Sequence, residues 1–283
     1  DGGGPATVRL GTNGALIGEA RSGATVDNNY DGAEILIEGG SDAIQGTIQG
    51  ALRGVIADST SGNITVQNLE SVSAGSGNPN DPEGPIPAGA GIEARSPGGM
   101  ITIQNITSVT SEQSWAIDAD TRNFLSSDPI TGERFFSGGG ADISIQNVAI
   151  PEFDDGNGNT IRSANGIRAF SGTGNINIGA DPNDPNSEIG DIFTDGIGIL
   201  ANNEGGTTTI HTLGTITAGA KGIAVDQDGA GKVTITTDGA LTSDGDGIYV
   251  YHSGTGDIAV TNNQTSTAGT VAQPSIGDGI YAR

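Results

Sequence analysis

The sequence predicts an all-β protein: a single parallel β-helix (β-solenoid) of about nine to ten coils, each with three short strands, interrupted by loop insertions. Three observations predict this fold. A short apolar element recurs nine times, a segment that begins with glycine precedes most of its copies, and a third apolar segment often follows. A repeat this short cannot bury an apolar face alone, so each coil needs its neighbours.

The recurring element has the form I-x-I. Its copies are Val8-Arg9-Leu10, Ile35-Leu36-Ile37, Ile64-Thr65-Val66, Ile101-Thr102-Ile103, Ile143-Ser144-Ile145, Ile176-Asn177-Ile178, Thr208-Thr209-Ile210, Val233-Thr234-Ile235 and Ile258-Ala259-Val260. The last residues of successive copies are 27, 29, 37, 42, 33, 32, 25 and 25 positions apart. The spacing indicates a basic unit of about 25 residues with insertions in the middle coils.

The segment before each I-x-I copy alternates apolar and polar residues after a glycine, as in Gly222-Ile223-Ala224-Val225. Such brief alternation, bounded by Gly, Asn, Asp and Ser, is typical of strands and leaves no room for a helix. Gly23 to Asp27 aligns with Gly222 to Asp226, which extends the solenoid almost to residue 1. The third segment is clearest in Leu69 to Val72.

One β-helix is therefore expected over residues 1–283. Five stretches exceed the repeat and are predicted insertions: 75–90, 122–139, 151–164, 179–187 and 262–276. The chain stops on Gly279 to Arg283, which has the form of the first strand of another coil. We therefore expect the chain to be a segment of a longer protein, since an uncapped coil exposes unpaired backbone groups.

Composition and charge limit the functional classes. Aromatic residues make up 4% of the chain and there are 49 glycines, so the core must consist of narrow stacks of aliphatic side chains. The net charge of −23 with only 11 basic residues argues against binding to nucleic acid or to an anionic membrane surface. The chain has no cysteine, which excludes disulfides and thiolate metal sites.

Two stretches near the C-terminal end, Gly245 to Tyr249 and Gly277 to Tyr281, share the sequence Gly-Asp-Gly-Ile-Tyr, and Ser253 to Thr261 follows the first. These repeats resemble the passenger domains of autotransporters (type V secretion) of Gram-negative bacteria. The resemblance implies a right-handed β-helix exported to the bacterial surface or the extracellular medium, with membrane contact only through a C-terminal barrel outside this segment. It also implies adhesion to a protein or glycan receptor on a host or neighbouring cell.

Catalysis is not expected. The Gly-Asp-Ser-Gly motif of a serine protease is missing, and the two histidines, His211 and His252, have no recognisable serine and aspartate partners in the sequence. The alternative is a carbohydrate-active β-helix enzyme, either a polysaccharide lyase or a glycoside hydrolase. It requires clustered carboxylates with a basic residue nearby, whereas most acidic residues here have the spacing of turn formers.

We predict no cofactor and no metal ion. The best calcium candidate is the insertion that carries Asp155, Asn157 and Asn159, but it lacks the glycine and the later glutamate of an EF-hand loop. Calcium binding by this acidic insertion therefore stays an open alternative to a plain solvated loop.

The repeat register predicts two side-chain ladders. Asp58, Arg95 and Asp120 share one position after the glycine-led segment, and Glu93, Asp118 and Arg168 share the position two residues earlier, so opposite charges should pair on an exposed surface. Asn68, Asn105 and Asn147 each follow a glutamine after the I-x-I element, so their amides should stack at one corner.

The candidate contact surface consists of aromatic residues on the coils and on the second insertion, because aromatic side chains are favoured in protein and sugar contacts. These residues are Tyr249, Tyr251, His252, Tyr281, Phe135 and Phe136. The tyrosines could instead shield further coils of a longer protein. The two phenylalanines could belong to a folded flap on the rod.

Overall fold

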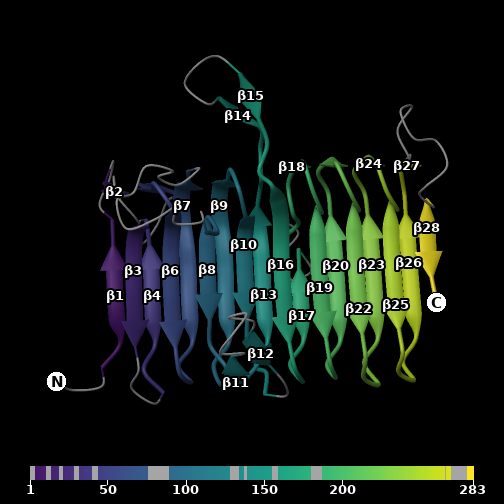
Figure 1. Ribbon diagram of the computed structural model, residues 1–283, viewed down its shortest axis with the longest axis horizontal. Coiled ribbons are helices and arrows are strands. Elements are labelled where there is room, and N and C mark those ends of the chain that lie inside the picture. The colour runs from purple at the N-terminus through teal and green to yellow at the C-terminus, as the bar shows by residue number, and fades with distance from the viewer. Residues whose placement is uncertain are drawn as a thin grey trace.

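The computed structural model describes residues 4–10, 14–18, 22–28, 32–39, 44–75, 89–127, 134–136, 139–154, 159–179, 187–264, 266–268 and 279–283. These residues contain strands and turns but no helix, so none of them forms a helix that could cross a bilayer. The strands lie side by side along one long axis, with the N-terminal coils at one end and the C-terminal coils at the other (Figure 1). Parallel pairing between consecutive coils confirms the predicted parallel β-helix.

The first sheet contains the I-x-I elements. In spatial order its strands are β1 (Ala6–Arg9), β4 (Ile35–Glu38), β7 (Ile64–Ala74), β9 (Ile101–Ser111), β13 (Ile143–Val148), β17 (Ile176–Ile178), β20 (Thr208–Thr212), β23 (Val233–Thr237) and β26 (Ile258–Asn262). Ile101 pairs with Ile64 and Ile143, and all three side chains are fully buried. Equivalent isoleucines therefore stack directly on one another to form the core.

The first copy of the element is displaced from its predicted register. Ile37 pairs with Val8, not with Leu10 as the sequence spacing suggested. A shift of two residues keeps the same side chains on the same face of a strand, so the apolar pattern could not distinguish the two registers.

The second sheet contains the glycine-led segments. Its strands are β3 (Ser22–Asn28), β6 (Arg53–Ser59), β8 (Ile92–Arg95), β10 (Trp115–Asp120), β16 (Asn165–Ser171), β19 (Ile199–Asn203), β22 (Ile223–Gln227), β25 (Ile248–His252) and β28 (Ile280–Ala282). The leading glycine is required by close packing of coils: a Cβ atom on Gly222 would lie 2.5 Å from the carbonyl oxygen of Gly247. The glycines thus mark where one coil approaches the next.

The third face of the rod changes along the chain. In the C-terminal half it is a parallel sheet of four separate strands: β18 (Ile192–Thr194), β21 (Ile216–Ala218), β24 (Leu241–Ser243) and β27 (Ser266–Ala268). In the N-terminal half it consists of β2 (Ala15–Gly18), β5 (Thr47–Gly50) and the ends of β7 and β9. Strand β27 lies inside the predicted insertion 262–276, so part of that stretch is regular coil.

An asparagine corner explains why β7 and β9 run through two faces without a break. Asn68, Asn105 and Asn147 have φ values of 56°, 55° and 47°, the left-handed conformation that asparagine tolerates better than most residues. The Nδ2 of Asn105 donates to the Oδ1 of Asn68 at 3.1 Å, and the Nδ2 of Asn147 donates to the Oδ1 of Asn105 at 3.0 Å. The predicted amide ladder is confirmed.

Two insertions form antiparallel ribbons beside the coils. Strands β11 (Phe124–Ser127) and β12 (Arg134–Phe136) pair in the second insertion. Strands β14 (Phe153–Asp154) and β15 (Thr160–Ile161) pair in the third, which projects from the rod (Figure 1). Residues 76–88 and 180–186, the bulk of the first and fourth insertions, lie outside the described residues, as do Asp155 and Asn157 of the calcium candidate.

Candidate functional site

The outward face of the second sheet gathers most of the residues that the sequence marked as functional candidates. Because alternate side chains of a strand point to opposite faces, the register defines two outward rows. The first row contains Glu93, Asp118, Arg168, Leu200, Ala224, Tyr249 and Tyr281. The second contains Arg95, Asp120, Phe170, Asn202, Asp226 and Tyr251. We call this surface the second-sheet face.

Charged residues occupy the N-terminal half of the second-sheet face. Asp118 receives a bidentate contact from Arg168: the Nε donates to Oδ1 at 2.8 Å and the Nη2 donates to Oδ2. Desolvation opposes the charge of Arg168, but the hydrogen bonds and charge of Asp118 raise the pKa of this guanidinium above its usual value. The guanidinium of Arg168 therefore keeps its charge beside Asp118.

The other two carboxylates of this half are also paired. Glu93 contacts Arg95 Nη2 through Oε1 at 2.7 Å and Arg53 Nε through Oε2 at 3.5 Å. Asp120 accepts hydrogen bonds from Arg122, from Nε to Oδ1 at 3.1 Å and from Nη2 to Oδ2 at 2.8 Å. The strand pairing confirms the predicted register of the charge ladder, and Arg168 pairs with Asp118 across neighbouring strands as predicted. Glu93 and Asp120 instead contact arginines two residues further along the chain.

The prediction that this ladder is exposed holds for Asp58 but is wrong for its other three carboxylates. The side chains of Glu93, Asp118 and Asp120 are only 11%, 8% and 9% exposed. They are shielded because each arginine lies over the carboxylate that it pairs with, and neighbouring strands bring these pairs together. The arginine cluster was not predicted, since Arg53, Arg95, Arg122 and Arg168 are far apart in the sequence.

Two aromatic side chains complete this half of the surface. The guanidinium carbon of Arg122 lies 4.3 Å from the ring centroid of Phe170, and that of Arg168 lies 5.3 Å from the same centroid. Arg168 also lies 5.5 Å from the ring centroid of Trp115. These cation–π contacts fix the arginines in place. The sequence signal that could have identified Phe170 is its alternation with the buried Ala169. Trp115 lies two residues before the buried Ile117, on the same side of the strand, so alternation gives no signal for it.

Tyrosines occupy the C-terminal half of the second-sheet face. The rings of Tyr249 and Tyr281 stack with centroids 5.3 Å apart and an interplanar angle of 5°, as expected from their shared row. The Nζ of Lys221 lies 3.4 Å from the ring centroid of Tyr249, and Arg283 lies 5.0 Å from that of Tyr251. The three tyrosines and two cations form one aromatic and cationic patch, which we call the tyrosine patch.

His252 does not belong to the tyrosine patch. Its Nε2 lies 2.8 Å from the carbonyl oxygen of Gly231, and its Nδ1 accepts a hydrogen bond from the backbone N–H of Gly254 at 3.1 Å. Because Nδ1 accepts, Nε2 is the nitrogen that donates to the carbonyl oxygen of Gly231. His252 therefore serves the turn after β25. The side chains of Phe135 and Phe136 lie outside the described residues, so only their pairing in the ribbon of β11 and β12 is established.

The other histidine has a carboxylate partner that the sequence did not reveal. The Nε2 of His211 lies 2.7 Å from the Oδ2 of Asp238, and Asn263 donates to the Oδ1 of Asp238 at 2.6 Å. The hydrogen bond from Asn263, followed by that from His211, holds the pKa of Asp238 below its usual value. The three residues come from adjacent coils on the outward side of the first sheet.

The chemistry available to the second-sheet face is limited by its own ion pairs. A glycoside hydrolase needs one carboxylic acid to donate a proton and one carboxylate to act as base or nucleophile. Both oxygens of Glu93, of Asp118 and of Asp120 are already engaged by arginine. Within the described part of the chain, no group of three His, Asp or Glu side chains has the arrangement of a metal site.

Comparison of the chain with protein-family models, with curated proteins and with solved structures finds no match. The functional assignment therefore rests on the geometry of the second-sheet face and on the repeat pattern of the sequence.

Proposed function

We propose that this protein is a non-catalytic bacterial adhesin, secreted or displayed at the cell surface, whose second-sheet face binds a protein or glycan receptor. The β-helix is the rigid scaffold and the tyrosine patch is the main contact. The pattern of the repeats, with its Gly-Asp-Gly-Ile-Tyr stretches, supports the proposed export as an autotransporter passenger. The acidic, cysteine-free composition is compatible with this export.

The single observation that carries the binding proposal is the tyrosine patch. Tyr249 and Tyr281 stack face to face, and Lys221 lies over Tyr249, so the rings are fixed before any partner arrives. A pre-organised aromatic surface loses little side-chain entropy on binding, and tyrosine is enriched among residues that dominate binding energy. The patch also offers phenolic hydroxyl groups for hydrogen bonds to a receptor.

The ion pairs of the charged half favour binding over glycan cleavage. Arg168 donates to both oxygens of Asp118, so neither oxygen is directed at a substrate, as the oxygen of a general acid must be. The same rigid charges can contribute specificity at the edge of a contact surface.

The test is adhesion of protein-coated beads to cultured epithelial cells and to bacterial cells. The double variant Tyr249→Ser/Tyr281→Ser should reduce bead retention about tenfold, in the range expected when two aromatic contacts are lost. Thr209→Ser/Thr234→Ser is the matched control, because these two residues occupy equivalent outward positions in adjacent coils of the first sheet.

Equal retention of both variants would contradict the proposal, as would failure of the unaltered protein to adhere to any cell. Enzyme activity is tested in parallel by release of reducing ends from a panel of polysaccharides. Release that disappears in Glu93→Gln or Asp118→Asn would favour the carbohydrate-active enzyme instead.

A further inference from the structure

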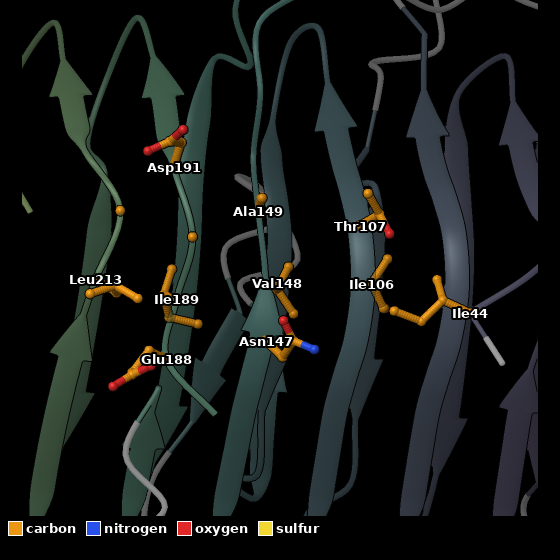
Figure 2. A pocket seen from close by; sticks show the side chains of 12 residues that line it. Ile44, Ile106, Thr107, Asn147, Val148, Ala149, Glu188, Ile189, Asp191 and Leu213 are labelled. Atoms are coloured by element: carbon orange, nitrogen blue, oxygen red, sulfur yellow. The ribbon is translucent and has the colours of Figure 1, made fainter. Parts of the chain in front are cut away.

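A groove of about 520 Å³ lies along the corner between the first sheet and the third face, away from the second-sheet face (Figure 2). Its lining runs from Ile44 at one end to Leu213 at the other and includes residues of three coils between them, but none of the coil of β7. The groove coincides with the point where the asparagine corner ends: Asn147 is the last amide of the ladder, and its backbone N–H donates to Ser187 in the next coil at 3.0 Å.

The floor and ends of the groove are aliphatic. Val148 and Ile189 belong to the buried core, and only their outer edges reach the groove. Ile44 and Leu213, by contrast, are 43% and 56% exposed, which makes them two of the few large apolar side chains exposed in the described coils. Exposed aliphatic side chains at both ends of a concave surface can hold the apolar side chains of a ligand that lies along it.

The polar groups of the groove are acidic or neutral. Glu188 lies beside Leu213 (Figure 2), and its carboxylate has no hydrogen-bond or ion-pair partner among the described residues. The Oδ1 of Asp191 accepts a hydrogen bond from the backbone N–H of Thr215 at 2.7 Å, which leaves Oδ2 available to a ligand. The groove lining contains no lysine, arginine or aromatic residue.

We propose that this groove binds an extended peptide segment that carries aliphatic side chains and at least one lysine or arginine. Five coil steps separate the coil of Ile44 from that of Leu213, which gives a length of about 24 Å, enough for about seven extended residues. The carboxylate of Glu188, which is unpaired among the described residues, lies in a chain with a net charge of −23 and therefore favours a cationic partner.

A peptide fits the groove better than an oligosaccharide does. Sugar rings are commonly held by stacking on aromatic side chains, which the lining lacks. A peptide instead places aliphatic side chains on the floor formed by Val148 and Ile189. Among the described residues no further amide of the ladder donates to the Oδ1 of Asn147, so this oxygen can receive a hydrogen bond from the peptide backbone.

The experiment is a selection from a displayed library of random heptapeptides on the immobilised protein, with counter-selection on the variant Leu213→Lys. Leu213 is exposed, so this substitution leaves the core intact while it removes the apolar end wall and repels a cation. Met100→Lys is the matched control, because Met100 is 42% exposed and lies outside the groove.

We expect enriched peptides to combine Leu, Ile or Val with Lys or Arg. Their affinity should fall about tenfold in Leu213→Lys and several-fold in Glu188→Gln, and should be unchanged in Met100→Lys. Their affinity should also be unchanged in Tyr249→Ser/Tyr281→Ser, which separates this site from the proposed adhesive face.

Three outcomes would overturn the inference: no enrichment over the counter-selection, enrichment of acidic peptides, or binding that Leu213→Lys leaves intact. A printed oligosaccharide panel is assayed alongside. A sugar that binds and is lost in Leu213→Lys, with no peptide enriched, would assign the groove to a glycan and reject the peptide.

Discussion

The coils around β7 and β9 and the coils from β19 to β26 share a core but differ at their corners. Strands β7 and β9 each run for 11 residues through an asparagine corner, whereas the later strands of the first and second sheets are five residues long and separate turns connect them. Buried isoleucines occupy equivalent positions in both regions, as Ile103 and Ile210 do. The stack of buried aliphatic side chains therefore specifies the solenoid, whereas the connection between two faces can differ from coil to coil.

The outward surfaces of the two regions differ in chemistry as well. The second-sheet face presents arginine–carboxylate pairs over β8, β10 and β16, and stacked tyrosines over β25 and β28. Because outward residues contribute little to the core, one scaffold can carry a self-paired charged region and an aromatic region side by side. The charged region has its interactions satisfied internally, and the aromatic region is the surface that we propose as the contact for a partner.

The largest expected effect tests the shared core. Ile103 pairs with Val66 and Ile145, and Ile210 pairs with Ile178 and Ile235, all in register. Ile103→Ala and Ile210→Ala should each lower the free energy of unfolding by about 2–5 kcal/mol, because each leaves a cavity in a close-packed stack. Denaturant unfolding measures the loss.

The outward neighbours Thr102 and Thr209 provide the controls for these core variants. Alanine at either position should change the free energy of unfolding by less than about 1 kcal/mol. If only one of Ile103→Ala and Ile210→Ala lowers the free energy of unfolding, the two regions do not share a continuous core.

The second effect separates the two halves of the second-sheet face. Arg168→Met leaves the buried carboxylate of Asp118 without its partner and should cost about 2–3 kcal/mol. Lys221→Met removes a cation whose Nζ lies 3.8 Å from the Oδ2 of Asp246, a looser and more exposed pair, and should cost at most about 1 kcal/mol. Thermal unfolding of the two variants gives the comparison.

A compensating change distinguishes loss of the ion pair from loss of packing. In Arg168→Met/Asp118→Asn the buried charge is gone, so part of the stability should return. If the double variant is no more stable than Arg168→Met, the guanidinium acts mainly through its contacts with Phe170 and Trp115.

The third effect tests the corner itself. Asn105 has a φ of 55° and holds two amide hydrogen bonds of the ladder. Asn105→Ala should lower stability by about 1–2 kcal/mol, because alanine is disfavoured in the left-handed conformation and cannot pair. Asn105→Gly keeps the conformation and loses only the amide contacts, so its unfolding midpoint should lie between those of Asn105→Ala and the unaltered protein. Equal midpoints for all three proteins would contradict a structural ladder.

The sequence predicted those features that repeat with the coil. The I-x-I elements, the leading glycines and the asparagine corner recur at matching positions, so the parallel fold, the core residues and the amide ladder followed from pattern alone. The register failed only at Val8 and Leu10, where a two-residue shift preserves the pattern.

Features that depend on contacts between nonequivalent positions could not be predicted in this way. Arg53 and Trp115 join the charged cluster from strand ends, where their register partners Ser22 and Asn165 are neither charged nor aromatic. Arg122 joins it from the turn that follows β10. Likewise, His211 meets Asp238 because a turn residue of one coil lies beside a strand residue of its neighbour. The groove arises from the change of corner after Asn147, which no single repeat contains.

The smallest effect compares two carboxylates whose pKa values are lowered in different regions. The hydrogen bond from Arg9, followed by that from Gln67 at 3.2 Å, lowers the pKa of Glu38 on the first sheet, and Asn263 and His211 lower that of Asp238. A carboxyl group with a lowered folded-state pKa stabilises the protein above its unfolded pKa, and this contribution disappears as the pH falls through the folded value. The unfolding temperature should therefore decline below about pH 4.5, the usual value for glutamate.

Glu38→Gln and Asp238→Asn should each reduce the free energy of unfolding that is lost between neutral and acid pH by a few tenths of a kcal/mol. The effect is small because one partner in each pair is partly exposed. Thermal unfolding from pH 7 to about pH 2.5 measures the slope, and the unaltered protein is the reference. If Glu38→Gln changes the slope while Asp238→Asn does not, acid sensitivity belongs to the N-terminal coils. In that case, acid should loosen the N-terminal coils while the tyrosine patch, at the other end of the rod, keeps its stacked geometry.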